Sequence, residues 1–124
     1  DVTIVAFSIM VGKALEAAEQ LADEGIDAEV IDLRTIRPLD EATIIESVKK
    51  TNRVVACEEG FPQYGIGAEI SARITEQAFD WLDAPIARVA AVDVPLPYAA
   101  NLEALALPQS IQIQNAAKAV CYRA

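Results

Sequence analysis

Apolar residues along the chain fall into two patterns, short continuous runs and longer stretches with helical spacing. The continuous runs are typical of strands covered on both faces, and they lie at residues 2–7, 27–33, 53–58 and 86–92. Apolar positions three and four residues apart predict helices over residues 11–24, 41–50, 68–77, 101–106 and 109–122. Strands that alternate with helices form parallel βαβ units with right-handed crossovers. We therefore expect one α/β domain over residues 1–124, a three-layer α/β/α sandwich around a mainly parallel sheet of about four strands.

Single residues mark the ends of the predicted helices. Gly25 stands where a left-handed C-terminal cap belongs, and Asn52 ends the second helix. Asp40 is suited to the start of that helix, because its side chain can accept a hydrogen bond from a free backbone amide. Within the first helix, we expect Val11 and Leu15 to lie on the buried face.

The charge balance opposes one class of partner. The chain holds 19 Asp and Glu against 10 Lys and Arg, a net charge of −9. Binding to phosphate backbones depends on clustered cations, so we expect no nucleic-acid partner. The same charge suits a basic protein partner, although the need for solubility explains it equally well.

The sequence carries no segment typical of membrane insertion or secretion. No apolar run approaches the ~20 residues that span a bilayer, so we expect no membrane partner. No basic segment is followed by an apolar stretch and a cleavage site. The chain begins at Asp1 without a methionine and enters a strand pattern almost at once. We therefore expect it to be a piece of a longer polypeptide.

Cysteine and histidine usage limits the chemistry open to the chain. Cys57 and Cys121 match no metal or redox spacing, so we expect both to behave as small buried apolar residues. Reduced thiols indicate a bacterial cytoplasm or a mitochondrial matrix. The chain holds no histidine, which excludes Ser-His and Cys-His nucleophile pairs and removes the commonest general base.

Residues 58–69, EEGFPQYGIGAE, form the segment where a ligand site is expected first. Ligands of open α/β sheets bind at loops that follow the carboxyl ends of strands. Gly65 and Gly67 are typical of dinucleotide-binding loops, but the third glycine of that fingerprint would fall at Ile70. We favour a structural role, in which the glycines permit a tight turn and a close approach of helix and sheet.

Two pairs of charged residues lie near this segment. Glu58 and Glu59 are adjacent, so in an extended strand they point to opposite faces and do not form a facing carboxylate pair. A buried carboxylate there serves as an acid or base, or accepts hydrogen bonds from loop amides, and we favour the second role. Arg34 and Arg37 follow the second strand at the same end of the sheet. They either form an internal bridge to Glu58 or Glu59 or contact a neighbouring domain.

Four motifs together resemble the C-terminal domain of the transketolase-like thiamine-diphosphate enzymes. They are DLRTIRPLD at residues 32–40, EEGFPQYGIGAE at 58–69, DAP at 83–85 and DVPLPY at 93–98. The last two narrow the resemblance to β subunits of the decarboxylating first component of pyruvate dehydrogenase complexes. The resemblance covers essentially the whole chain, and its motifs are far more specific than a pair of glycines.

The resemblance implies a function that composition does not reveal. The family's intact component is an α₂β₂ assembly that decarboxylates pyruvate on thiamine diphosphate with magnesium and reductively acetylates a lipoyl group. Its cofactor and the catalytic residues of the β subunit involve the N-terminal domain, so the resemblance implies no catalytic, cofactor-binding or metal-binding residue here. It implies an assembly and docking domain that contacts the α subunit, the second β subunit and the peripheral subunit-binding domain of the dihydrolipoamide acetyltransferase.

The resemblance and the sequence pattern together give candidate contact residues. The acid of the family's docking motif corresponds to Asp83, which would pair with a basic residue of the acetyltransferase domain. The chain end, which also takes part in the family, corresponds to Ala124 if this is the natural terminus. A lone tryptophan is usually a core residue, but an aromatic–acid cluster suits an interface. Our candidates for subunit interfaces are Arg34, Arg37, Glu59, Phe61, Tyr64 and Trp81.

Two alternatives stay open at this point. The same domain occurs in branched-chain 2-oxoacid dehydrogenases and in transketolase itself, and the family's substrate pocket lies outside this chain. From a different class, the chain would be an independent small nucleotide-binding α/β enzyme that uses the loop at residues 58–67. Stabilisation of the isolated domain by nucleotides or thiamine diphosphate would favour that second alternative.

Overall fold

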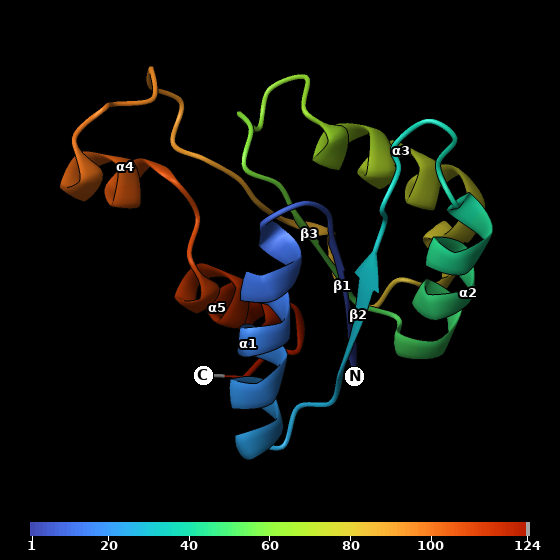
Figure 1. The fold of residues 1–124 in the computed structure, drawn as a ribbon. Helices are drawn as coiled ribbons and strands as arrows, with labels where there is room; N and C mark the ends of the chain where they lie inside the picture. Colours follow the sequence, from blue (N-terminus) through green and yellow to red (C-terminus); the bar gives the residue numbers. More distant parts are fainter. Residues whose placement is uncertain (124) are drawn as a thin grey trace.

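The computed structural model describes residues 1–123, which form a four-stranded sheet with all strands parallel (Figure 1). Strand β1 is central, and its residue Val5 lies opposite Ile31 of one neighbour and Ala56 of the other. The order is β2-β1-β3-β4, with β1 at Val2–Ala6, β2 at Ala28–Asp32, β3 at Val54–Cys57 and β4 at Ala87–Val89. The predicted parallel sheet of about four strands is confirmed.

Helices cover both faces of this sheet, α2 and α3 on one side and α1 and α5 on the other (Figure 1). Their bounds are α1 at Met10–Asp23, α2 at Glu41–Thr51, α3 at Ile66–Ala78 and α5 at Ser110–Val120. A 3-10 turn, η1 (Phe79–Trp81), follows α3, and a short helix, α4 (Ala100–Ala106), lies apart from the sheet. The layers are those of the predicted α/β/α sandwich.

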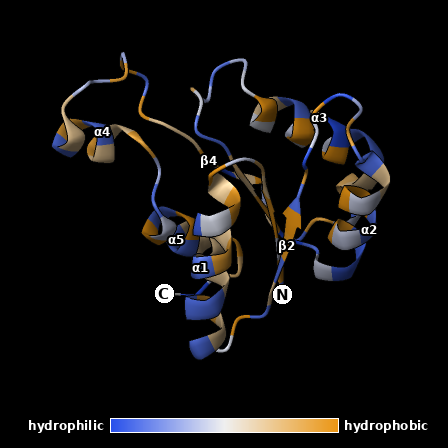
Figure 2. Cartoon of the chain, viewed as in Figure 1, coloured by the Kyte–Doolittle hydropathy of each residue, from blue (hydrophilic) through white to orange (hydrophobic). Residues whose placement is uncertain are grey.

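The central strand β1 divides its side chains between two hydrophobic cores. Val2 and Ile4 pack with residues of α1 and α5, whereas Val5 packs with residues of α2 and α3. All three are essentially inaccessible to solvent, and burial of each is worth roughly 1.5–3 kcal/mol. Figure 2 shows the strands as predominantly hydrophobic and the helices as mixed. Because both faces are covered, the strands read as continuous apolar runs in the sequence.

Thr3 is the polar exception in β1, and its neighbours satisfy its buried hydroxyl group. The Oγ1 atom of Thr3 lies 2.7 Å from Ser47 Oγ and 2.7 Å from Thr51 Oγ1. Thr51 in turn donates to the backbone oxygen of Arg53 over 3.1 Å. This chain of hydroxyl groups ties the end of α2 to β1 and to the residue before β3. Each buried hydroxyl group has a partner, which avoids the cost of burying an unpaired polar group.

The predicted helix ends are confirmed at three positions. Gly25 has a φ of 84°, and Asn52 caps α2 in the left-handed conformation with a φ of 66°. The carboxylate of Asp40 accepts a hydrogen bond from the backbone amide of Thr43 and a second from its hydroxyl group. These bonds, the hydroxyl bond above all, lower the pKa of Asp40, because they stabilise its charged form.

The predicted buried face of α1 is wrong in part. Leu15 is 53% exposed, while the stripe of Met10, Ala14 and Ala17 is fully buried. The helix begins at Met10, and positions 10, 14 and 17 follow its period of 3.6 residues toward the sheet. Leu15 follows the buried Ala14 by one residue, about 100° around the helix, and therefore points away from the sheet. No helix within residues 1–123 is long and apolar enough to cross a membrane.

Candidate docking site

The structure places the candidate residues at opposite ends of the sheet. Parallel strands share one end where they begin and another where they finish, here called the amino end and the carboxyl end. Trp81 and Asp83 precede β4 and therefore lie at the amino end. Ala124 lies outside the described residues. The remaining candidates follow β2 or β3 at the carboxyl end: Arg34, Arg37, Glu59, Phe61 and Tyr64.

Asp83 is fixed through its backbone while its carboxylate stays accessible. Its amide donates to the backbone oxygen of Asn52 over 2.9 Å, which ties the segment before β4 to the end of α2. The Asp83 side chain is 57% exposed. Its Oδ2 lies 3.8 Å from Nη2 of Arg53, a separation near the limit of an ion pair. The carboxylate is therefore held in place but free to accept a further cation.

Val120 and Tyr122, at the end of α5 and just after it, are linked to this acid. Tyr122 donates from its hydroxyl group to the backbone oxygen of Asp83 over 3.0 Å. Arg53 donates from Nε to the backbone oxygen of Val120 over 3.0 Å, so one guanidinium reaches both Asp83 and the last turn of α5. Arg123 donates to the backbone oxygen of Glu24 over 2.8 Å. Arg53 and Tyr122 thus link Asp83 to the end of α5, while Arg123 separately ties the residues after α5 to the end of α1.

Trp81 belongs to the surface and not to the core. It is 46% exposed, and Nζ of Lys49 lies 5.6 Å from the centre of a ring. The side-chain amide of Asn52 donates to the backbone oxygen of Trp81 over 2.6 Å. The indole is consequently held on the outer face of α2 at the amino end of the sheet.

At the carboxyl end, Arg34 and Arg37 are exposed, and the internal bridge considered for them is wrong. Within residues 1–123, neither arginine forms an ion pair with Glu58 or Glu59. Glu58 instead pairs with Arg88 of β4, with 3.6 Å between its Oε1 and Nη2 of the arginine. The two guanidinium groups after β2 are therefore available to carboxylates outside this domain.

The loop after β3 is built on the buried Glu58 carboxylate. Glu58 is 3% exposed and accepts a hydrogen bond from the amide of Gly67 at 3.4 Å, while Arg88 also donates to the backbone oxygen of Pro62. A Cβ atom on Gly65 would lie 2.3 Å from Glu58 Oε1, which no real structure tolerates. The structural interpretation of both glycines is supported by these contacts. The sequence feature that could have indicated Arg88 as the partner of Glu58 is the presence of an arginine inside the apolar run at residues 86–92.

Two aromatic residues of this loop point to solvent. Phe61 is 47% exposed and Tyr64 is 95% exposed, and Glu59 beside them is half-buried. Phe61 also lines an apolar hollow of about 330 Å³ whose other walls come from the segment between β4 and α5. Exposed aromatic residues beside apolar surface are typical of protein interfaces.

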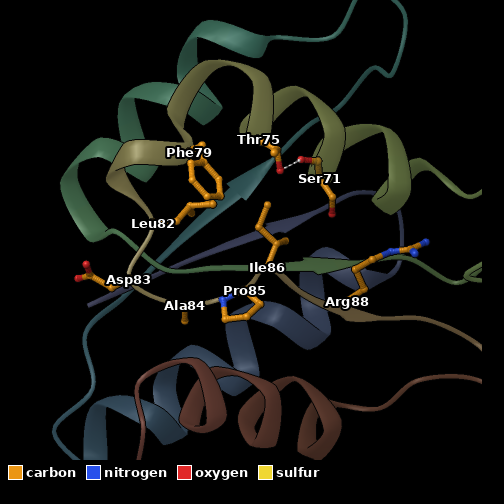
Figure 3. A pocket seen from close by; sticks show the side chains of 9 residues that line it. All are labelled: Ser71, Thr75, Phe79, Leu82, Asp83, Ala84, Pro85, Ile86 and Arg88. Atoms are coloured by element: carbon orange, nitrogen blue, oxygen red, sulfur yellow. Dashed lines mark hydrogen bonds between the residues drawn. The ribbon is translucent and has the colours of Figure 1, made fainter.

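A groove of about 600 Å³ lies between α3 and β4, with Asp83 at one end. Figure 3 shows Asp83 and Arg88 at opposite ends of the labelled residues, with Phe79, Leu82 and Ile86 between them. Strand β4 pairs with β3 alone, so the groove runs along the outer side of the last strand. Sequence reasoning did not predict this groove, because the order of the strands decides which edge is open.

The described residues do not fit a magnesium ion or a thiamine diphosphate. No group of three or more Cys, Asp or Glu side chains within residues 1–123 is arranged to hold a metal ion, and the sequence has no histidine. Side chains of Glu58 and Arg88 occupy the space beside Gly65 and Gly67, and Glu58 already accepts a hydrogen bond from the Gly67 amide. A carboxylate therefore lies where a phosphate-binding loop needs free amides. We assign no step of chemistry to this domain through either group.

The fold is that of a three-layer α/β domain whose candidate contact residues lie at both ends of a parallel sheet. The family model described as "Transketolase, C-terminal domain" matches residues 1–113. The chain therefore belongs to the transketolase C-terminal domain family. A solved structure described as "Split gene transketolase, inactive beta4 tetramer" is similar, with a TM-score of 0.86, 31% identity, and coverage of 98% of this chain and 39% of that one.

Curated relatives narrow the resemblance to one kind of subunit. The mitochondrial pyruvate dehydrogenase E1 component subunit beta-1 of Oryza sativa subsp. japonica is 64% identical over 124 residues, which cover 100% of this chain and 33% of the relative. Subunit beta of the same component from Rhizobium meliloti (strain 1021) is 58% identical over 123 residues, 99% of this chain and 27% of the relative. The chain thus spans about a third of these relatives, and the predicted resemblance is confirmed.

Proposed function

We propose that the chain is the assembly and docking domain of the β subunit of a thiamine-diphosphate-dependent pyruvate dehydrogenase. The proposal rests above all on the cluster in which Asp83, Arg53 and Tyr122 join the segment before β4 to residues 120–122. The family uses both of these segments for docking, and here they share one exposed face. The partner is the peripheral subunit-binding domain of the dihydrolipoamide acetyltransferase, which supplies a basic residue to Asp83.

The carboxyl end of the sheet supplies the assembly surface in this proposal. Exposed Arg34 and Arg37, together with Phe61 and Tyr64, face the α subunit or the second β subunit of the heterotetramer. Arginine and aromatic residues are enriched in protein interfaces, and lysine is depleted there. Trp81 extends the contact surface at the opposite end, and Glu59 completes the polar edge beside Phe61.

Chemistry belongs to the rest of the parent enzyme. Thiamine diphosphate with magnesium would bind between the α subunit and the β subunit's remaining domain, where it would supply the electron sink that decarboxylation of pyruvate needs. Residues of this domain hold the assembly together and bind the acetyltransferase. Pyruvate is favoured over branched-chain 2-oxoacids by the identity of 58–65% with pyruvate dehydrogenase subunits. The compartment is a bacterial cytoplasm or a mitochondrial matrix.

The test is calorimetry of the intact α₂β₂ component against the purified subunit-binding domain. Asp83→Asn removes the charge and keeps the size, so we expect a loss of about 1–3 kcal/mol, roughly five- to 150-fold in affinity. The salt dependence of binding should flatten as well, because one charge pair is lost. Asp80→Asn is the matched control, since Asp80 is an exposed acid three residues away.

Unchanged affinity and unchanged salt dependence in the Asp83→Asn component would show that this acid does not dock the partner. An equal loss in Asp80→Asn would show that general negative charge, and not the Asp83 cluster, attracts the acetyltransferase domain. Only a selective effect at Asp83 supports the proposal.

A further inference from the structure

The groove between α3 and β4 is mostly apolar and opens directly beside Asp83. Its volume is about 600 Å³, enough for more than one large side chain. The lining comes from the outer side of α3, the turn after it and the start of β4 (Figure 3). The lining residues are Ser71, Thr75, Phe79, Leu82, Asp83, Ala84, Pro85, Ile86 and Arg88.

The two charged residues of the groove differ in how far they are already neutralised. Arg88 pairs with the buried Glu58 and donates to the backbone oxygen of Pro62, so its guanidinium is engaged within the domain. Asp83 is more than half exposed, and its contact with Arg53 is 3.8 Å long. The groove therefore offers one available charge, which is negative and lies at one end (Figure 3).

The walls of the groove remain incompletely covered. Phe79 is 65% exposed although its ring lies along the apolar wall. The Oγ atom of Ser71 is buried and has no hydrogen-bond partner within the described residues, and Figure 3 shows this side chain on the wall of the groove. Exposed aromatic surface and an unsatisfied hydroxyl group both mark a surface that a partner completes.

We propose that this groove receives a large apolar side chain of the same basic segment whose lysine or arginine pairs with Asp83. This inference rests on the docking function proposed above and adds a second, apolar anchor to it. Leu82 and Pro85 flank Asp83 closely in the chain, so one short segment can reach both features. Residues three or four apart on a helix, or two apart on a strand, lie about 5–7 Å from each other. An acid and an apolar wall side by side match such a pair.

Apolar and ionic contacts leave different thermodynamic signatures, which separates the two anchors. Loss of a charge pair changes the salt dependence of binding, whereas loss of an apolar contact changes affinity with little effect on that dependence. Burial of apolar surface also gives a negative heat-capacity change of binding. A groove contact therefore predicts a salt-independent component of affinity together with a negative heat-capacity change.

The test fills the groove in the intact α₂β₂ component and measures binding of the subunit-binding domain by calorimetry. Thr75→Phe places a phenyl ring over the groove from an exposed position of α3. Ala72→Phe adds the same ring at an exposed position of α3 outside the lining. We expect Thr75→Phe to weaken binding by roughly tenfold or more at every salt concentration, and Ala72→Phe to leave it unchanged.

Phe79→Ala is the second variant, because it removes apolar wall and adds no bulk. It should weaken binding severalfold and make the heat-capacity change less negative. Unchanged binding in both Thr75→Phe and Phe79→Ala would overturn the groove proposal. If Asp83→Asn still weakened binding in that case, the docking function would stand without the groove. If all three variants bound normally, the docking function itself would be wrong.

Discussion

The hydroxyl group of Tyr122 donates a hydrogen bond to the backbone oxygen of Asp83 over 3.0 Å. This bond joins residues 39 positions apart and places Tyr122, which follows α5, beside the acid that precedes β4. Arg53 strengthens the link, since it reaches both Asp83 and the last turn of α5. The segment before β4 and residues 120–122 thus lie together in this structure, which would reduce the cost of ordering them when the partner proposed above binds.

Removal of this bond should loosen the chain end. We expect Tyr122→Phe to lower the free energy of unfolding by about 0.5–1.5 kcal/mol, the usual net value of a neutral hydrogen bond. Urea denaturation of the purified chain measures the change. Tyr98→Phe is the matched control, because Tyr98 is fully exposed and should tolerate the loss of its hydroxyl group. Equal stability of Tyr122→Phe and the wild type would show that the bond does not hold the terminus.

The loop after β3 should be intolerant of a side chain at Gly65. A Cβ atom there would lie 2.3 Å from Glu58 Oε1 and 2.6 Å from the backbone oxygen of Phe61, and neither atom can easily move. Overpacking of this kind costs about 1–3 kcal/mol, so we expect Gly65→Ala to destabilise the chain by at least that amount.

Gly60→Ala provides the comparison in the same loop. A Cβ atom at Gly60 would meet nothing within 4 Å. The free energy of unfolding of Gly60→Ala should therefore lie within about 0.5 kcal/mol of the wild-type value. Thermal unfolding of both variants under one set of conditions measures the difference in their stability. Similar stability of Gly65→Ala and Gly60→Ala would contradict the proposed close packing around Glu58.

Local sequence signals predicted the elements of the fold well. Apolar runs gave four strands because the sheet is covered on both faces, and Asp40 and Asn52 marked helix ends because their side chains or backbone conformations suit those positions. Leu15 was misplaced because the buried stripe of α1 runs through Met10 and Ala14, one residue and about 100° of helix rotation away from the stripe predicted through Val11 and Leu15. Periodicity fixes the existence of an amphipathic helix more firmly than its rotation.

Contacts between distant segments were beyond sequence reasoning. The pairing of Glu58 with Arg88 depends on β4 lying beside β3, and the order of strands in the sheet cannot be read from local sequence patterns. The same holds for Asp83 and Tyr122, which meet only because α5 returns to the amino end of the sheet. Asp83 itself was predicted from the family motif, whereas its support by Asn52 and Arg53 required the structure.

Arg88 should matter far more to stability than a surface arginine. Arg88→Met keeps the apolar stem but leaves the buried carboxylate of Glu58 without its cation, so we expect a loss of about 2–4 kcal/mol in unfolding free energy. Arg73→Met is the matched control, because Arg73 pairs with the partly exposed Glu41 and Glu69. Such surface pairs contribute about 0–1 kcal/mol. Equal losses in the two variants, measured by urea denaturation, would refute a special role for the buried pair.

The two cysteines should differ sharply in reactivity. Burial raises the pKa of the Cys57 thiol to about 12, because the charged thiolate is poorly solvated in the core, whereas Cys121 is partly exposed. We expect a thiol reagent at pH 8 to modify Cys121 in the folded chain and to reach Cys57 only after unfolding. Mass spectrometry of proteolytic fragments assigns the modified residue.

The raised pKa of Cys57 also predicts how stability depends on pH. The ordinary pKa is 9.0, so the unfolded chain releases this proton as the pH rises above 9 while the folded chain retains it up to about 12. Stability contributed by the neutral thiol is therefore complete below pH 9 and is lost progressively between pH 9 and 12. Cys57→Ala should be less stable at pH 8, because it leaves a small cavity, but should show a shallower loss above pH 9. Parallel curves for the two proteins between pH 9 and 11 would contradict the burial of a protonated thiol.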